Sequence, residues 1–293
     1  MPQPSFSREF TDQFNPPPVT YVDLSCKTVI VIGANTGIGL EAAKHFAERG
    51  EAAAVEIKTE TTYEKIEVWT IDLSNFSSVT SFAEQFEREG GRLDIVVANA
   101  GIAASSLEFT DDGWESTYQI NYISGALLSL LLLPRMLETA REYNTTPRIT
   151  LVVSRLHYFV KFDSNLINAP NTLRLHGHKD YFNQRIAEGK YNGDDIYAES
   201  KLLGVYFART LNDRLAGKPL IINTVDPGFC KSSIGRNRKG VESFIFNLLS
   251  KTVGRTSEEG SRQLVWAAVG GEDQKENLRG AFVDMASKNW WVE

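Results

Sequence analysis

The sequence predicts an α/β fold: a single-domain, doubly wound parallel sheet of the Rossmann-like type, with helices on both faces. Three observations predict it. Residues 28–32 form a continuous run of β-branched side chains, which is typical of a strand buried on both faces. A glycine-rich turn follows directly, and then a helix with apolar residues at helical spacing. Strand and helix patterns alternate through the rest of the chain, as a helix-covered parallel sheet requires.

The glycine-rich turn contains Gly33, Gly37 and Gly39, and it lies between the first strand and a helix over residues 40–49. This order puts a helix N-terminus at the carboxyl end of a strand. Backbone N–H groups and the helix dipole favour a phosphate there, and glycines let a diphosphate approach the main chain. The turn therefore predicts a dinucleotide site.

Composition excludes several other classes of protein. The chain has 293 residues, 42% of them hydrophobic, and a net charge of −6, which gives no basic surface for nucleic acid or an anionic membrane. Cys26 and Cys230 are too few and too far apart for a disulfide framework, and His176-x-His178 is interpreted as a solvated loop pair rather than a metal site. The longest apolar run, 126–133, is too short to span a bilayer, and the N-terminus has no signal-peptide core. We expect a cytoplasmic enzyme without a metal.

The remaining elements follow in order. Residues 1–22, rich in Pro, Ser and Phe, predict an extended arm on the surface, and residues 23–293 form the dinucleotide-binding catalytic domain. Alternating or continuous apolar residues predict further strands at 66–71, 93–98, 148–153, 220–225 and 280–283. Helical spacing predicts helices at 79–86, 114–135, 196–215 and 257–268, the second of them ended by Pro134.

Polar or glycine residues occupy the ends of the predicted strands. Beyond the glycine turn, they are Asp72, Asn99-Ala100-Gly101, Ser154 and Pro227-Gly228. In open parallel sheets, ligands bind outside the carboxyl ends of the strands. We therefore expect these residues to converge on one edge of the sheet, although Asp72 alone is equally consistent with an ordinary turn.

Tyr197 and Lys201 lie four residues apart on a predicted helix and so share a face. A tyrosine hydroxyl titrates near ~10, and its use as an acid or base around neutrality requires a pKa lower by ~2–3 units. A lysine ammonium one turn away, together with the positive ring of an oxidised nicotinamide, can supply that shift. Ser154, at the end of the preceding strand, can hold a substrate oxygen beside the tyrosine.

With these motifs, the chain resembles the short-chain dehydrogenase/reductase family over roughly residues 24–283. The resemblance implies NAD(P)-dependent alcohol–carbonyl chemistry, with Ser154, Tyr197 and Lys201 as catalytic residues. It implies that Asn121 holds a water in the proton relay. The cofactor-binding residues that it implies are Gly33, Asn35, Thr36, Gly37, Ile38, Gly39, Asp72, Asn99, Ala100, Gly101, Tyr197, Lys201, Pro227, Gly228, Cys230 and Ser232.

Two features point to a branch of this family. Ser154-x-x-His157 and the long gap between Ser154 and Tyr197 resemble the retinol-dehydrogenase-like branch, which carries an insertion there. The segment 227–232 and the Pro-rich arm are similar to fungal members that tailor secondary metabolites. The branch implies NADP(H) as the cofactor, with NAD(H) left open.

The sequence departs from the family pattern after the first helix. Members carry a second strand there, which ends in a residue that binds the adenosine ribose. Residues 51–58 instead follow Gly50 directly, and their alanine-rich composition favours a helix. We therefore expect the second strand to be missing, together with the Arg that would bind a 2′-phosphate. Alternatively, residues 52–57 are the strand, and Glu56 binds a ribose hydroxyl, which would favour NAD.

A second departure is that the chain stops soon after Trp290-Trp291, where related sequences usually continue. Either departure is also consistent with a gene-model error.

The predicted function is the interconversion of a secondary alcohol and a ketone on an apolar small molecule. The alternative is a catalytically silent dinucleotide-binding or scaffold protein. The segment 229–246, which mixes Phe and Ile with Lys and Arg, predicts either a lid over an apolar ligand or an amphipathic surface helix. No nucleic-acid partner or membrane span is expected, and both a monomer and a homo-oligomer remain open.

Overall fold

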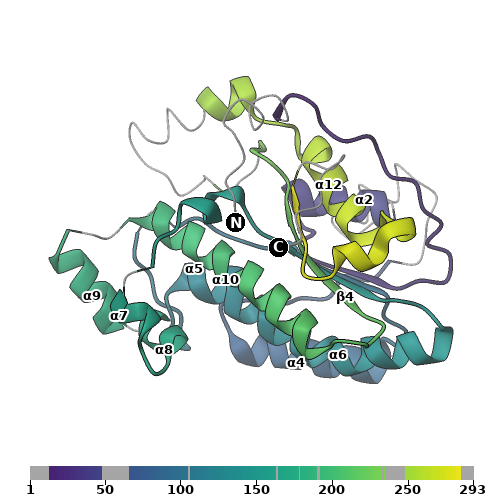
Figure 1. The fold of residues 1–293 in the computed structure, drawn as a ribbon, viewed down its shortest axis with the longest axis horizontal. Coiled ribbons are helices and arrows are strands. Elements are labelled where there is room, and N and C mark those ends of the chain that lie inside the picture. Colours follow the sequence, from purple (N-terminus) through teal and green to yellow (C-terminus); the bar gives the residue numbers. More distant parts are fainter. Residues whose placement is uncertain are drawn as a thin grey trace.

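The computed structural model describes residues 13–47, 66–104, 106–162, 164–177, 179–189, 192–231, 234 and 248–284. Within these residues, five parallel strands form one sheet in the order β1-β2-β3-β4-β5, with helices on both sides (Figure 1). The strands are β1 (Val29–Ile32), β2 (Ile95–Ala98), β3 (Arg148–Val152), β4 (Ile221–Asp226) and β5 (Phe282–Asp284). The predicted fold class is confirmed.

Side chains from the strands alternate between two apolar cores, as the period of two in a strand requires. Val96 and Ile149 point to a core shared with α4 (Phe76–Glu89), α6 (Ser124–Tyr143) and α10 (Gly193–Arg214). Ile95 and Val97 point to the opposite core, which is shared with α2 (Gly37–Ala47) and α12 (Ser257–Val269). Burial on both faces explains why these strands are continuous apolar runs.

The predicted strand over residues 66–71 is wrong, because these residues have no regular secondary structure and pair with no strand of the described chain. Their alternation is nevertheless real: Trp69 and Ile71 pack against the core under α4, and Trp69 meets the rings of Phe82 and Phe86 at 5.7 and 5.8 Å. A strand also needs a neighbour in the sheet. The segment that would supply it, including Glu56 and the alternative strand at 52–57, lies outside the described residues.

The predicted end of the long helix at Pro134 is also wrong. The helical segment begins with α5 (Ser116–Tyr118), passes through a π-helical turn (Gln119–Ile123) and continues as α6 to Tyr143. Proline has no N–H group, so the carbonyl of Leu130, four residues earlier, loses its helical hydrogen bond. Both residues lie on the exposed side of α6, where water can bind this carbonyl instead. Within the described chain, this one helix, Ser116–Tyr143, is long and apolar enough to cross a membrane by length and composition. Its buried residues, such as Leu128 and Met136, pack in the core with α4.

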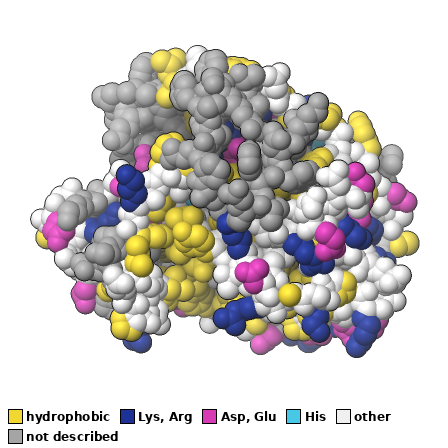
Figure 2. Space-filling model, viewed as in Figure 1, with side chains coloured by type: hydrophobic (Ala, Val, Ile, Leu, Met, Phe, Trp, Pro, Cys, Tyr) yellow, Lys and Arg dark blue, Asp and Glu magenta, His cyan; other side chains and the backbone are white. Residues whose placement is uncertain are grey.

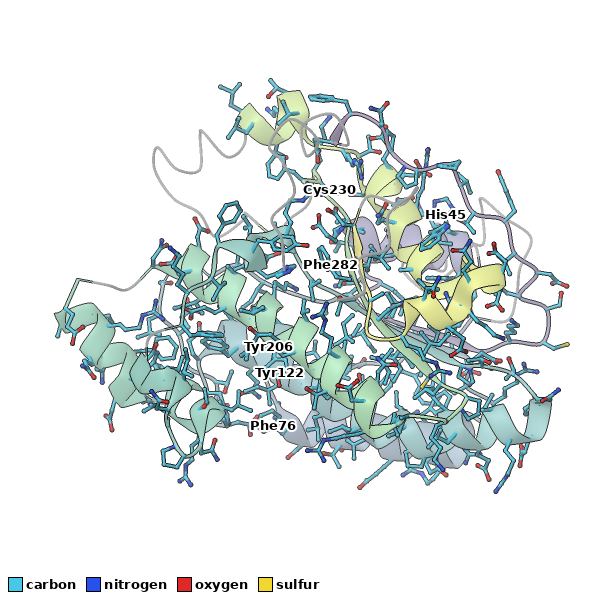
Figure 3. All side chains as sticks on the ribbon, in the orientation of Figure 1. His45, Phe76, Tyr122, Tyr206, Cys230 and Phe282 are labelled. Atoms are coloured by element: carbon cyan, nitrogen blue, oxygen red, sulfur yellow. The ribbon has the colours of Figure 1, made fainter. Side chains whose placement is uncertain are left out.

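The polar segment between β3 and α10 contains three short helices, α7 (Ser164–Ile167), α8 (Thr172–Gly177) and α9 (Lys179–Ala187). They project to one side of the molecule (Figure 1). Figure 2 shows an apolar area between them and the body of the protein, over α10. Tyr206, which is 49% exposed, lies at this place in Figure 3.

Candidate active site

The glycine turn is fixed against the residues that follow β2. Gly33 has φ +80°, and a Cβ on it would lie 2.9 Å from Ala100. A Cβ on Gly39 would lie 2.2 Å from the Asn99 Nδ2, which itself donates to the carbonyls of Ile32 and Gly33 at 3.3 and 3.2 Å. Gly33 and Gly39 are therefore required for the close approach of the turn, the first helix and the end of β2.

The N-terminus of α2 has the properties of a phosphate site. The helix begins at Gly37, which has φ +60°, and its first turn contains no acidic residue that would neutralise the helix dipole. Asn35 and Thr36 are exposed before it, whereas Ile38 packs against the core under α12. These residues fit a diphosphate, with Ile38 available through its main chain only.

Ser154 follows β3 and caps a short 3₁₀-helix (Arg155–Phe159), its hydroxyl accepting from the backbone of Leu156 at 3.3 Å. The Ser154 carbonyl lies 2.7 Å from the Nδ1 of His157. Because a carbonyl only accepts, Nδ1 carries the proton, and Nε2 is left without a partner among the described residues. Burial lowers the pKa of His157 and keeps the ring neutral.

Lys201 is buried in α10, one turn after Tyr197, and its Nζ donates to the carbonyl of Val152 at 2.9 Å. Asn121 lies in the π-helical turn, where its side chain binds the backbone of Ile102 in both directions, at 2.7 and 2.8 Å. A Cβ on Gly101 would lie 3.2 Å from the Asn121 Oδ1 and 3.3 Å from the Lys201 Nζ. The Asn121 and Lys201 side chains therefore both approach Gly101. Functional sites frequently contain such π-helical turns.

The chain raises the pKa of Tyr197, first by burial and then through the charge of Asp226, while a hydrogen bond with Ser154 lowers it. The spacing of Tyr197 and Lys201 predicts instead that Lys201 lowers this pKa. Burial lowers the pKa of Lys201 to about 8, so the side chain is still mostly cationic at pH 7, and its Nζ lies 5.5 Å from the centre of the Tyr197 ring. The pKa of Tyr197 is raised despite this charge. A positive nicotinamide ring beside the Tyr197 hydroxyl would lower the pKa of Tyr197.

Arg155, for which the sequence predicted no role, joins the ends of three strands. Arg155 follows Ser154, and its Nε and Nη2 each lie 2.8 Å from a carboxylate, Asp226 at the end of β4 and Asp284 at the end of β5. Asp226 is only 3% exposed. The guanidinium therefore offsets negative charge next to Tyr197 and Lys201, whose pKa values Asp226 raises.

The other predicted cofactor residues differ in their surroundings. The Asp72 carboxylate accepts from the backbone and hydroxyl of Ser74 at 2.9 and 2.7 Å, so it shapes the turn before α4. Gly228 has φ +81° after the buried Pro227. Cys230 is buried, donates to the Pro227 carbonyl at 3.4 Å, and has a pKa raised to about 12 by burial, so only its main chain can face a ligand. The predicted residue Ser232, most of the proposed lid and the Trp290-Trp291 end lie outside the described residues.

A second missed feature joins the α7–α9 insertion to the catalytic helix. Glu199, between Tyr197 and Lys201, accepts from the hydroxyl of Tyr118 and from Arg185 of α9 at 3.2 Å. Phe182 of α9 is fully buried beside Tyr118. The sequence spacing holds no signal for this contact, because Glu199 and Tyr118 are 81 residues apart.

Comparison with known proteins identifies the family. Residues 27–143 match the family model for short chain dehydrogenases. The short chain dehydrogenase sol3 of Alternaria solani is 34% identical over 90% of this chain and 91% of its own length, and atnD of Emericella nidulans is 34% identical over 92% and 88%. The chain belongs to the short-chain dehydrogenase/reductase family. Its members are oxidoreductases that act on CH–OH groups with NAD(P).

The fold agrees with this assignment. A short chain dehydrogenase from Burkholderia cenocepacia, solved in complex with NADP, is similar with a TM-score of 0.60 at 18% identity, over 88% of this chain and 95% of that one. At this identity, the likeness shows the shared fold.

Replacement of Lys201 by Met is expected to stabilise the protein by about 2 kcal/mol at pH 7. Burial lowers the Lys201 pKa from 10.5 to about 8, and each pKa unit corresponds to about 1.4 kcal/mol of destabilisation that the variant removes. The lost hydrogen bond to the Val152 carbonyl takes about 1 kcal/mol from this gain. The unfolded chain binds more protons between about pH 8 and 10.5, so wild-type stability rises across that window and the advantage of Lys201→Met disappears. Urea unfolding at pH 7 and pH 10 measures this. Lys218→Met, at an exposed lysine, is the control, and a destabilised Lys201→Met at pH 7 would refute the expectation.

Proposed function

We propose that this oxidoreductase uses NADP(H) to interconvert a secondary alcohol and a ketone on an apolar small molecule. The observation that carries the proposal is that Tyr197 and the buried Lys201 lie one turn apart on α10, with Lys201 bound to the end of β3 next to Ser154, at the same sheet edge as the glycine turn. This supports a reaction in which a proton donor and an oxyanion-stabilising hydroxyl act on one substrate oxygen.

The residues of the chain have separate roles in the reducing direction. Ser154 donates a hydrogen bond to the carbonyl oxygen, and Tyr197 transfers its proton to that oxygen as the carbonyl is reduced. Lys201 holds the nicotinamide ribose, and Asn121 connects Lys201 to solvent through water. The bound nicotinamide supplies the hydride.

The proposed substrate class rests on the fungal relatives and on two segments of the sequence. Both relatives described above are fungal, and the arm and the segment 227–232 are similar to fungal members that tailor secondary metabolites. We propose an apolar polyketide or terpenoid ketone as the substrate class and a cytoplasmic location. A panel of aromatic and alicyclic ketones with NADPH, compared with hydrophilic sugar ketones, tests the apolar preference.

Discrimination between the two cofactors is expected to be weak. No arginine lies between Gly50 and Ile66 in the sequence, and Asn35 and Thr36 of the glycine turn are neutral. Without a guanidinium, the 2′-phosphate loses a charge-assisted contact of about 1.5–3 kcal/mol, or roughly ten- to a hundred-fold in affinity. Fluorescence titrations with NADPH and NADH at one ionic strength measure both dissociation constants. A preference beyond about a thousand-fold, or roughly 4 kcal/mol, for either cofactor would contradict this expectation.

A further inference from the structure

The described part of the N-terminal arm is bound to the loop that follows β4. The Gln13 Nε2 donates to the carbonyl of Phe229 at 2.7 Å, and the Gln13 Oε1 accepts from the Phe229 N–H at 3.1 Å. The amide thus satisfies both main-chain groups of one residue, as a neighbouring strand would do. A second donation, to the carbonyl of Val253 at 2.9 Å, joins the segment before α12 to the same side chain.

Arg255 also joins the arm to this loop through hydrogen bonds. It is 3% exposed, and its Nε donates to the Gln13 carbonyl at 3.1 Å while its Nη1 donates to the Pro227 carbonyl at 3.3 Å. The backbone of Arg255 pairs with the loop through Phe229 at 2.9 Å and Lys231 at 2.7 Å. A Cβ on Gly228 would lie 3.2 Å from both the Gln13 Oε1 and the Arg255 Nη1, so the arm reaches the loop at its glycine.

The same assembly extends to the glycine turn. The Ser257 hydroxyl, in the first turn of α12, donates to the Lys231 carbonyl at 2.9 Å. It is also the nearest atom to the position of a Cβ on Gly37, at 3.9 Å. Further along the arm, the buried Pro17 accepts from Arg262 of α12 at 3.2 Å, and Figure 1 shows the arm running past α12 and α2. The arm therefore contacts the 227–231 loop and α12. The loop lies on the nicotinamide side of the proposed cofactor site, and the start of α12 lies next to the glycine turn.

We propose that Gln13 is a positioning residue for cofactor binding: it holds the 227–231 loop and the start of α12 in the arrangement that the cofactor needs. This inference rests on the proposed function, because the loop matters only if a nicotinamide cofactor binds beside it. An unrestrained loop must be ordered on binding, and that ordering weakens affinity.

The test compares Gln13→Met, which keeps the length of the side chain and removes its polar groups, with Tyr21→Ala on the same arm, where Tyr21 is 90% exposed. Hydrogen exchange of peptides covering 227–231 is measured without cofactor. Energy transfer from tryptophan to NADPH gives the dissociation constant, at a temperature where thermal unfolding shows both variants to be folded. We expect Gln13→Met to exchange the Phe229 and Lys231 amides at least about tenfold faster and to bind NADPH about tenfold more weakly, which is about 1.4 kcal/mol. Tyr21→Ala should match the wild type in both.

Three results would overturn the proposal. Unchanged exchange in Gln13→Met would show that the arm does not hold the loop. Faster exchange with unchanged NADPH affinity would limit Gln13 to a structural role. A wild-type protein that binds no NADPH would remove the cofactor-binding role together with the proposed function, and the exchange data, which need no cofactor, would still show whether the contact itself is present.

Discussion

Replacement of Tyr197 by Phe is expected to lower kcat by about a hundredfold or more, the usual contribution of a general acid. The variant keeps the aromatic ring in α10 and removes only the hydroxyl that we propose as the proton donor. Affinity for NADPH should change little, because the hydroxyl acts on the substrate oxygen. The measurement is steady-state reduction of any ketone that the wild type turns over, together with an NADPH titration of each protein.

Tyr206→Phe is the matched control for this variant. It lies on the same helix, is 49% exposed, and should retain wild-type kcat. If Tyr197→Phe keeps nearly normal kcat, Tyr197 is not the proton donor.

Replacement of Arg155 by Met is expected to destabilise the protein by about 3–5 kcal/mol, the usual effect of removing one partner from a buried ion pair. The guanidinium binds Asp226, whose side chain is 4% exposed, and Asp284, whose side chain is 18% exposed. Methionine fills a similar volume but leaves Asp226 without this counter-charge in a place that water hardly reaches. Urea unfolding at pH 7 gives the free energy of unfolding of both proteins.

Arg141→Met is the control for charge removal at the surface. Arg141 is 75% exposed and lies 3.5 Å from Glu138, so its loss should cost within about 1 kcal/mol. Addition of Asp226→Asn to Arg155→Met should recover part of the lost stability, because it removes the uncompensated charge. If Arg155→Met and Arg141→Met lower the free energy of unfolding equally, the ion pair between Arg155 and Asp226 does not stabilise the ends of the three strands.

The sequence was sufficient for the elements whose residues are determined locally or by burial. Five of the predicted strands lie within a few residues of β1, β2, β3, β4 and β5, because a two-sided core demands apolar runs there. Asn99 and Ala100 were also expected at the same edge of the sheet as the glycine turn, since parallel strands end at a common edge, and they lie against that turn. The close packing around Gly33 and Gly39 explains why a glycine pattern was informative.

Predictions failed where a distant part of the chain decided the outcome. The alternation at 66–71 correctly indicated a buried face, but strand pairing depends on a neighbour that the pattern does not contain. Pro134 did not end α6, because tertiary packing of the helix outweighs the loss of one exposed hydrogen bond. The partners of Arg155 are 71 and 129 residues away, and Gln13 contacts a residue 216 positions later. No local spacing marks such contacts.

The position of a nicotinamide cofactor in a crystal structure of the complex with NADP⁺ tests the central claim most directly. We predict the diphosphate on the N-terminal turn of α2 at Gly37, and the nicotinamide ring beside the Tyr197 hydroxyl and the Ser154 hydroxyl, with Lys201 on its ribose. A cofactor bound elsewhere, or no cofactor at millimolar NADP⁺, would contradict the assignment of this sheet edge as the active site.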